Sequence, residues 1–338
     1  MTTFVDTASN LNDSQKLIDA IEALGGRIRD AKAGIGRVIF GQPTVIEETL
    51  ITLLAGGHVL LIGVPGLGKT KLVDTLGTVF GLESRRVQFT PDLMPADILG
   101  SEVLEESEDG RRSFRFIQGP VFCQLLMADE INRASPRTQS ALLQAMQEHR
   151  VAVAGHHHIL PRPFYVLATQ NPLEQEGTYP LPEAQLDRFF MQIDVEHPDV
   201  AAERDVLIAT TGAREDHAPR VMTPDDLIEA QRLVRHVPVG ESVVEAILKI
   251  VRSGRPESSD LEPVRRHVSW GPGPRASQAL MLGVRARAVT QGRLSPSIDD
   301  VMALVHPILR HRMALNFAAR AEGVHVGQII DKLCERIS

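Results

Sequence analysis

One stretch of the chain decides its fold: Gly63-Val64-Pro65-Gly66-Leu67-Gly68-Lys69-Thr70. An apolar run, residues 58–62, precedes it and has the pattern of a short buried strand. After it, apolar residues recur at helical spacing, at Leu72, Leu76, Val79 and Phe80. The order of strand, glycine-rich loop and helix is the context that a phosphate-binding loop requires. We therefore predict that this stretch binds the phosphates of a nucleoside triphosphate.

Each fixed position of this loop has a chemical reason. Gly66 and Gly68 let successive backbone N–H groups surround phosphate oxygens without obstruction by side chains. The N-terminus of the following helix adds its partial positive charge. Lys69 is placed to reach the β- and γ-phosphates, and the Thr70 hydroxyl is placed to bind Mg²⁺.

A second apolar run, residues 124–128, ends in two adjacent carboxylates, Asp129 and Glu130. Ligands of parallel α/β sheets bind at the carboxyl ends of the strands, where both side chains would emerge. Asp129 is suited to hold Mg²⁺ through its water shell. Glu130 is suited to orient and deprotonate an attacking water. The pair predicts hydrolysis in addition to binding.

A third apolar run, residues 164–169, is followed by Asn171, whose amide would lie beside Glu130 and bond the γ-phosphate or the water. Arg188 follows later, at the end of a predicted helix. Taken alone it would be an ordinary surface cation, but its position after Asn171 makes it a candidate for the same chemistry.

The remaining pattern predicts an α/β fold with an all-helical C-terminal part. Residues 1–12 are polar and predicted to be loose, and a helix is expected from Ser14 to Gly25-Gly26. Residues 100–122 alternate around Asp109-Gly110, which predicts a hairpin inserted in the nucleotide domain. No strand alternation follows residue 220. We predict an N-terminal segment 1–34, a core 35–212 with inserts at about 100–120 and 151–162, and a lid 213–338.

The second predicted hairpin carries His156, His157 and His158. Neighbouring residues of a strand point to opposite faces, so only His156 and His158 would share a metal site. A solvated turn is the better interpretation. The acidic run of the first hairpin is likewise expected to be solvated.

Composition limits the class of protein. The chain has 338 residues, of which 43% are hydrophobic and 23% charged, as in a protein with a substantial core. Its net charge of −7 argues against a surface made to grip nucleic acid. Two cysteines favour a reducing cytosol over a disulfide framework, so we expect a cytoplasmic protein. No signal peptide and no membrane span are predicted.

Over residues 35–320 the motifs resemble those of the MoxR family of AAA+ ATPases. The matching stretches are Gly63–Thr70, Ala128–Ala134, Ala168–Pro172, Glu176–Phe189 and Gly273–Ala276. The resemblance implies a P-loop AAA+ core whose parallel sheet is flanked by helices, two β-hairpin inserts and a helical lid. The hairpins correspond to the family's helix-2 insert and pre-sensor-1 hairpin.

The resemblance also implies roles for single residues. Lys69 and Thr70 would belong to Walker A, and Asp129 and Glu130 to Walker B. Asn171 would be sensor 1, Arg188 the arginine finger and Arg275 sensor 2. Arg275 is left open between its own site and a neighbour's. Arg133 is left open between a subunit boundary and a structural ion pair.

Family members usually form hexameric rings with ATP between subunits, and an arginine finger then acts on the neighbour's site. The resemblance implies ATP and Mg²⁺ as cofactors and a protein client, often with a von Willebrand factor A-domain partner. One alternative is a motor or loader on nucleic acid, which net acidity and 4% aromatic residues disfavour. Another is an ATP-gated scaffold, against which Glu130, Asn171 and Arg188 argue.

Overall fold

The computed structural model describes residues 4–106, 112–174, 176–212 and 217–337. The chain divides into two units. One, here called the sheet unit, contains residues 35–49 and 56–224. The other, the helical unit, contains residues 1–34, 50–55 and 225–338. Helix α2 (Pro43–Ala55) contributes residues to both.

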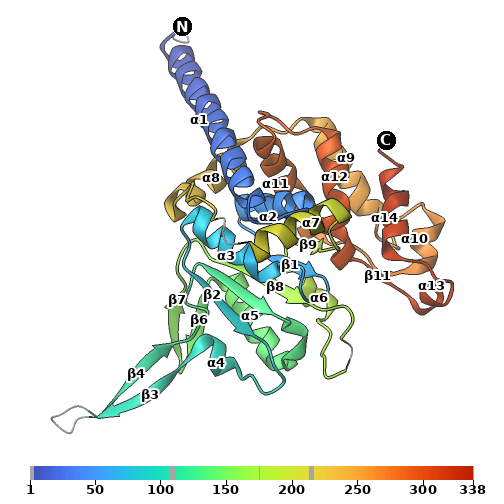
Figure 1. Ribbon diagram of the computed structural model, residues 1–338. Coiled ribbons are helices and arrows are strands. Elements are labelled where there is room, and N and C mark those ends of the chain that lie inside the picture. The colour runs from blue at the N-terminus through green and yellow to red at the C-terminus, as the bar shows by residue number, and fades with distance from the viewer. Residues whose placement is uncertain (1–3, 107–111, 175, 213–216, 338) are drawn as a thin grey trace. The chain divides into compact units, whose positions relative to one another are not determined.

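The sheet unit is built on five parallel strands in the order β2-β5-β8-β1-β9 (Figure 1). Their bounds are β1 (Val59–Ile62), β2 (Ser84–Gln88), β5 (Leu125–Asp129), β8 (Tyr165–Gln170) and β9 (Met191–Asp194). The central strands are almost wholly buried, as in a parallel sheet with helices on both faces. Such strands appear in sequence as continuous apolar runs, which is why they were predictable.

Helices pack on this sheet through their apolar sides. The helices of the unit are α3 (Lys69–Phe80), α4 (Pro95–Leu99), α5 (Pro136–Glu148), α6 (Glu183–Leu186) and α7 (Val200–Thr211), with a 3₁₀ turn, η1 (Ile131–Arg133). Helix α5 buries Leu142 and Met146 in one cluster with side chains of β5 and β8. The predicted N-cap of α5 is confirmed, because Ser135 accepts a hydrogen bond from the Thr138 N–H.

Both predicted hairpins are present and extend from the same end of the sheet unit (Figure 1). Strands β3 (Gly100–Glu106) and β4 (Arg112–Gln118) pair antiparallel. Strands β6 (Arg150–Val153) and β7 (His156–Ile159) do the same. The predicted Asp109-Gly110 turn lies outside the described residues. Within the described chain, no group of histidine, cysteine or acidic side chains is arranged to hold a metal.

The two hairpins contact each other through aromatic rings. Phe116 of β4 stacks on His158 of β7, with ring centroids 3.8 Å apart and planes 17° from parallel. Phe116 also meets Phe122 edge to face, at 5.6 Å. On the first hairpin, Arg112 pairs with Glu106 and Arg115 with Glu105. Two of the three acidic residues in its described part, Glu105 and Glu106, are therefore paired with arginines of the opposite strand.

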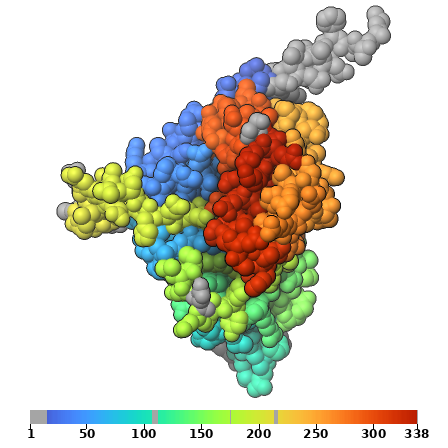
Figure 2. All heavy atoms as spheres, turned by 90° about the vertical axis from the view of Figure 1, so that its right-hand side faces the viewer, coloured from blue at the N-terminus to red at the C-terminus, as the bar shows by residue number. Residues whose placement is uncertain are grey.

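The helical unit contains most of α1 (Phe4–Gly36) and the C-terminal helices. These are α8 (Pro224–His236), α9 (Glu241–Ser253), α10 (Glu262–His267), α11 (Pro274–Thr290), α12 (Ile298–Leu309), α13 (Phe317–Ala321) and α14 (Val326–Cys334), with a 3₁₀ turn η2 (Arg310–Arg312). The last helix, α14, packs against α9 and α12 (Figures 1 and 2). The described part of the chain has no helix long and apolar enough to cross a membrane.

Two predictions about this unit were wrong. Helix α1 is continuous from Phe4 to Gly36, so it neither starts at Ser14 nor ends at Gly25-Gly26. Packing outweighs the cost of about 1 kcal/mol for a helical glycine, because a Cβ at Gly25 would lie 3.1 Å from the Val289 carbonyl of α11. The unit also contains a two-stranded ladder, β10 (Val268–Trp270) and β11 (Ala314–Leu315). These strands are too short to show alternation.

Candidate nucleotide-binding site

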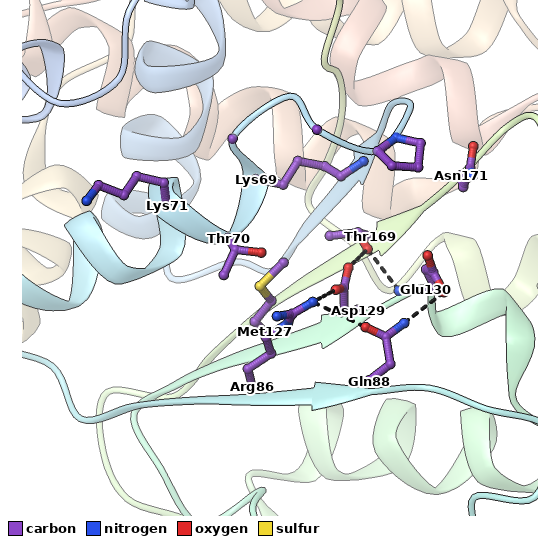
Figure 3. Close-up of a pocket in the computed structure, with 13 residues that line it drawn as sticks. Lys69, Thr70, Lys71, Arg86, Gln88, Met127, Asp129, Glu130, Thr169 and Asn171 are labelled. Atoms are coloured by element: carbon purple, nitrogen blue, oxygen red, sulfur yellow. Dashed lines mark hydrogen bonds and ion pairs between the residues drawn. The ribbon is translucent and has the colours of Figure 1, made fainter. Parts of the chain in front are cut away.

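The carboxyl ends of β1, β5 and β8 open into a cavity of about 420 Å³ (Figure 3). Its volume falls within the range of small-molecule sites. The cavity brings together side chains that lie far apart in sequence. It is lined by Pro65, Gly66, Gly68, Lys69, Thr70, Lys71, Arg86, Gln88, Met127, Asp129, Glu130, Thr169 and Asn171.

The loop between β1 and α3 has a backbone that its glycines make possible. Gly66 and Gly68 have φ angles of +88° and +75°, in the left-handed region that favours glycine. Gly63 is required for a different reason, since a Cβ there would lie 2.6 Å from the Val195 carbonyl oxygen. Val64 and Leu67 do not line the cavity: Val64 offers its carbonyl to Lys69, and the Leu67 carbonyl accepts from Gln42.

Lys69 folds back over its own loop. Its Nζ donates to the carbonyl oxygens of Gly63 at 2.5 Å and of Val64 at 3.0 Å. Burial lowers the pKa of Lys69, and the charges of Asp129 and Glu130 partly oppose that change. Thr70 faces the acidic side of the cavity, whereas Lys71, which also lines the cavity, points away from Asp129 and Glu130 (Figure 3).

Asp129, the last residue of β5, is buried, and both of its carboxylate oxygens have partners. The Thr169 hydroxyl donates to Oδ1 at 2.5 Å, and Arg86 Nη2 lies 2.5 Å from Oδ2. The arginine comes from the adjacent strand β2 and is half-exposed. The carboxylate is thus charge-balanced by the chain itself.

Glu130 is held in three ways. Its backbone is left-handed, with φ 54°, and its N–H donates to the Thr169 hydroxyl at 2.9 Å. Its Oε2 accepts from Gln88 Nε2 at 2.7 Å and from Arg133 Nη1 at 2.9 Å. Of the two roles left open for Arg133, this structure shows the pairing with an acid.

Asn171 also lines the cavity, and it is buried. Its Oδ1 accepts the Leu173 N–H at 3.1 Å, which caps the turn after β8. Arg188 lies just after α6, half-buried, and is not among the residues that line the cavity. Arg275 occupies the first turn of α11 and belongs to the helical unit, where it is exposed.

Three residues that bond the acidic pair carried no predicted role: Arg86, Gln88 and Thr169. All three lie at or near the ends of strands that flank β5. In the sequence, each of these residues is a polar side chain at or near the end of a stretch with the pattern of a strand. Assigning these polar residues to the site requires knowing that β2 and β8 lie beside β5 in the sheet. The order of the strands along the chain does not give that information.

A smaller cavity of about 230 Å³ adjoins the first on the far side of the loop. Gly66, Gly68 and Lys71 line both. The rest of its lining is mostly apolar and consists of Val38, Ile39, Phe40, Gln42, Leu67, Pro198, Val206 and Thr210.

The donors at the phosphate loop fit a magnesium ion. The Thr70 hydroxyl and the Asp129 carboxylate are oxygen ligands on the same cavity, and Mg²⁺ prefers oxygen ligands and keeps several waters. Together the parallel sheet, the glycine loop and the acidic strand end define a P-loop ATPase of the AAA+ class. Residues 58–191 match the ATPase family associated with various cellular activities (AAA), and residues 263–333 match the AAA lid domain.

Relatives extend the match over nearly the whole chain. Chaperone MoxR1 of Mycobacterium tuberculosis H37Rv is 39% identical over 305 residues, which are 90% of this chain and 80% of the relative. Protein MoxR of Paracoccus denitrificans is 32% identical and covers 86% of this chain and 89% of its own. A crystal structure from Cytophaga hutchinsonii, described as a "putative ATPase", superposes with a TM-score of 0.88 at 35% identity, over 97% of this chain and 98% of that one. The chain belongs to the MoxR family of AAA+ ATPases.

Proposed function

We propose that this protein is a Mg²⁺-dependent ATP hydrolase whose sites are shared between subunits of a ring, and that it remodels or activates protein clients. The main support for hydrolase activity is that Lys69, Asp129 and Glu130 line the same cavity. A loop that only bound nucleotide would have no use for a second carboxylate beside the phosphates.

The proposed roles follow from the contacts. The backbone N–H groups of residues 63–70 and Lys69 hold the phosphates, which requires Lys69 to leave its loop carbonyls. Thr70 and Asp129 would hold Mg²⁺, which neutralises charge on the phosphates. Glu130 orients and deprotonates the water, and Asn171 bonds the water or the γ-phosphate. The smaller apolar cavity is placed to take the base, with ATP as the expected nucleotide.

Sharing of the site is supported by the position of Arg188. It does not line the cavity of its own chain, so its charge is available to a neighbour's site, where it would stabilise the transferring phosphoryl group. We propose a ring homo-oligomer, a hexamer as in most family members. Arg275 would add a further charge from the helical unit, in its own site or in a neighbour's.

The proposed client is a protein. A relative bears the name chaperone, and the family's frequent partner is a von Willebrand factor A-domain protein. In the described part of the first hairpin, Arg112 and Arg115 pair with glutamates, which disfavours a nucleic-acid groove there. A cytoplasmic location fits this function, without direct insertion in a membrane. A pull-down with the Glu130→Gln variant and ATP should retain the client.

Two substitutions test the hydrolase directly. Glu130→Gln removes the proposed base but keeps the shape of the side chain. It should lower kcat at least about a hundredfold, while nucleotide affinity stays within a few fold of the parent's. Lys69→Ala should weaken nucleotide binding strongly. Lys332→Ala, at an exposed lysine of α14 that pairs with Glu335 and lines neither cavity, is the control. Equal turnover in Glu130→Gln and the parent would exclude Glu130 as the base.

Mixing tests the shared site. Glu130→Gln chains keep a normal Arg188, and Arg188→Ala chains keep a normal Glu130. A mixed ring therefore contains sites with both groups intact, and activity should return to a fraction set by the mixing ratio. A mixture that stays inactive at every ratio would contradict sharing through Arg188.

A further inference from the structure

Gln139, near the start of α5, is a fully buried polar side chain that does not line the nucleotide cavity. Its Nε2 lies within hydrogen-bonding distance of three backbone carbonyl oxygens, those of Ile131 (3.2 Å), Ala134 (3.1 Å) and Tyr179 (2.9 Å). An amide has two N–H groups, so three acceptors share two protons. One side chain thus binds two separate loops.

The two loops carry the two halves of the proposed chemistry. Ile131 and Ala134 bound the turn η1 that directly follows Glu130. Tyr179 lies in the segment that leads through α6 to Arg188. The loops also bond each other, because the Tyr179 N–H donates to the Asn132 carbonyl at 2.6 Å.

Packing alone does not explain a glutamine at this position. Among the described residues, Gln139 Oε1 is buried without a hydrogen-bond partner, and so is Asn132 Oδ1 in the adjacent turn. A buried acceptor without a partner destabilises the fold, because nothing compensates for the water that it loses. A leucine would fill similar space without that cost. What the position uses is therefore the donor that reaches three carbonyls.

We propose that Gln139 is a positioning residue that couples the turn carrying Glu130 to the segment carrying Arg188. The inference rests on the proposed function, in which Glu130 serves the chain's own site and Arg188 serves a neighbour's. Movement of the Glu130 turn is then passed through Gln139 to the arginine. In a ring, the state of one site reaches the next through the interior of a single subunit.

The test compares Gln139→Leu with Gln144→Leu. Gln144 lies on the exposed side of the same helix, where its amide donates to Glu148, so it is the matched control. Gln139→Met, unbranched and of similar length, is a second variant for the case in which leucine prevents folding. Circular dichroism and nucleotide affinity first establish that each variant is folded and binds normally.

Amide hydrogen exchange of the chain without nucleotide is the first readout. Gln139→Leu should speed exchange about tenfold or more in both residues 131–134 and residues 176–188, because both lose a shared anchor. Gln144→Leu should change neither. Faster exchange in one segment only, or in none, would overturn the coupling.

Mixing is the second readout. Gln139→Leu chains should restore activity neither with Glu130→Gln chains, which need an intact Glu130 from their partner, nor with Arg188→Ala chains, which need an intact Arg188. Restored activity with either variant would show that Gln139 supports only Glu130 or only Arg188, and would overturn the proposal. If Glu130→Gln and Arg188→Ala chains fail to restore each other, the shared site is wrong, and the exchange experiment still decides the coupling.

Discussion

At the scale of single residues, Thr169 sets the geometry of the acidic pair. Its hydroxyl accepts the N–H of Glu130 and donates to Asp129, so one oxygen fixes both neighbours. The left-handed backbone of Glu130 has a conformational cost of order 1–3 kcal/mol. The Thr169 bond opposes that cost and aims the carboxylate into the cavity.

His58, just before β1, makes the stability of the sheet unit depend on pH. Burial lowers its pKa from 6.5 to about 4. Its Nδ1 accepts the Val166 N–H and its Nε2 lies 3.2 Å from the Met146 carbonyl oxygen, so the neutral ring with a proton on Nε2 fits the fold. Since the unfolded chain binds this proton more readily, stability is full above pH 6.5 and is lost as pH falls towards about 4.

The expected loss is about 3 kcal/mol in the free energy of unfolding. His58→Gln keeps a donor and an acceptor but does not titrate, so urea unfolding at about pH 7 and about pH 4.5 should show a smaller loss than in the parent. His157→Gln, an exposed histidine of β7, is the control and should behave as the parent. An equal loss in all three chains would show that folding does not lower the pKa of His58.

The chemistry of the site could be predicted residue by residue only where a motif is local. Lys69, Thr70, Asp129, Glu130 and Asn171 lie together because each follows a strand that the apolar pattern reveals. The partners of the carboxylates depend on the register Gln88↔Asp129 between β2 and β5. That pairing joins segments far apart in the sequence, and no periodic pattern of residues predicts it.

At the scale of elements, the two hairpins depend on each other. A two-stranded hairpin alone is marginally stable, and most of β3–β4 is exposed. The stack of Phe116 on His158, with Phe122 at its edge, packs the two hairpins against each other.

Phe116→Ala should therefore loosen both hairpins. We expect faster amide exchange in β3–β4 and also in β6–β7, because the ring that joins them is gone. Phe114→Ala is the matched control, since Phe114 is a phenylalanine of the same strand that is 71% exposed and should matter by less than about 0.5 kcal/mol. Exchange that rises only within β3–β4 would show that the second hairpin stands alone.

Helix boundaries show the limit of local reasoning. Gly25-Gly26 resembles a helix end, yet α1 continues through it because Gly25 allows close contact with α11, more than two hundred residues later in the chain. Ser135 and Pro136 predicted the start of α5 correctly, since a cap acts within one turn. Sequence signals predicted helix ends correctly where the interactions that set the end lie within one helical turn.

At the scale of the whole molecule, the proposed sharing of each site with a neighbour would make turnover depend on assembly. ATP hydrolysis per chain should rise with chain concentration and level off as the oligomer fills, whereas nucleotide binding by the loop should change little. Turnover and light-scattering mass measured on the same dilution series would test this. A monomeric fraction that hydrolyses ATP as fast as the oligomer would contradict a shared site.

The partners of the acidic pair have one more consequence. Within the chain itself, Arg86 and Thr169 bond Asp129, while Gln88 and Arg133 bond Glu130. In the proposed reaction, binding of the magnesium–nucleotide complex is then an exchange of partners and not a simple addition. Its free energy is the difference between two satisfied states, which keeps affinity moderate. On release of product, the same side chains would again bond the carboxylates.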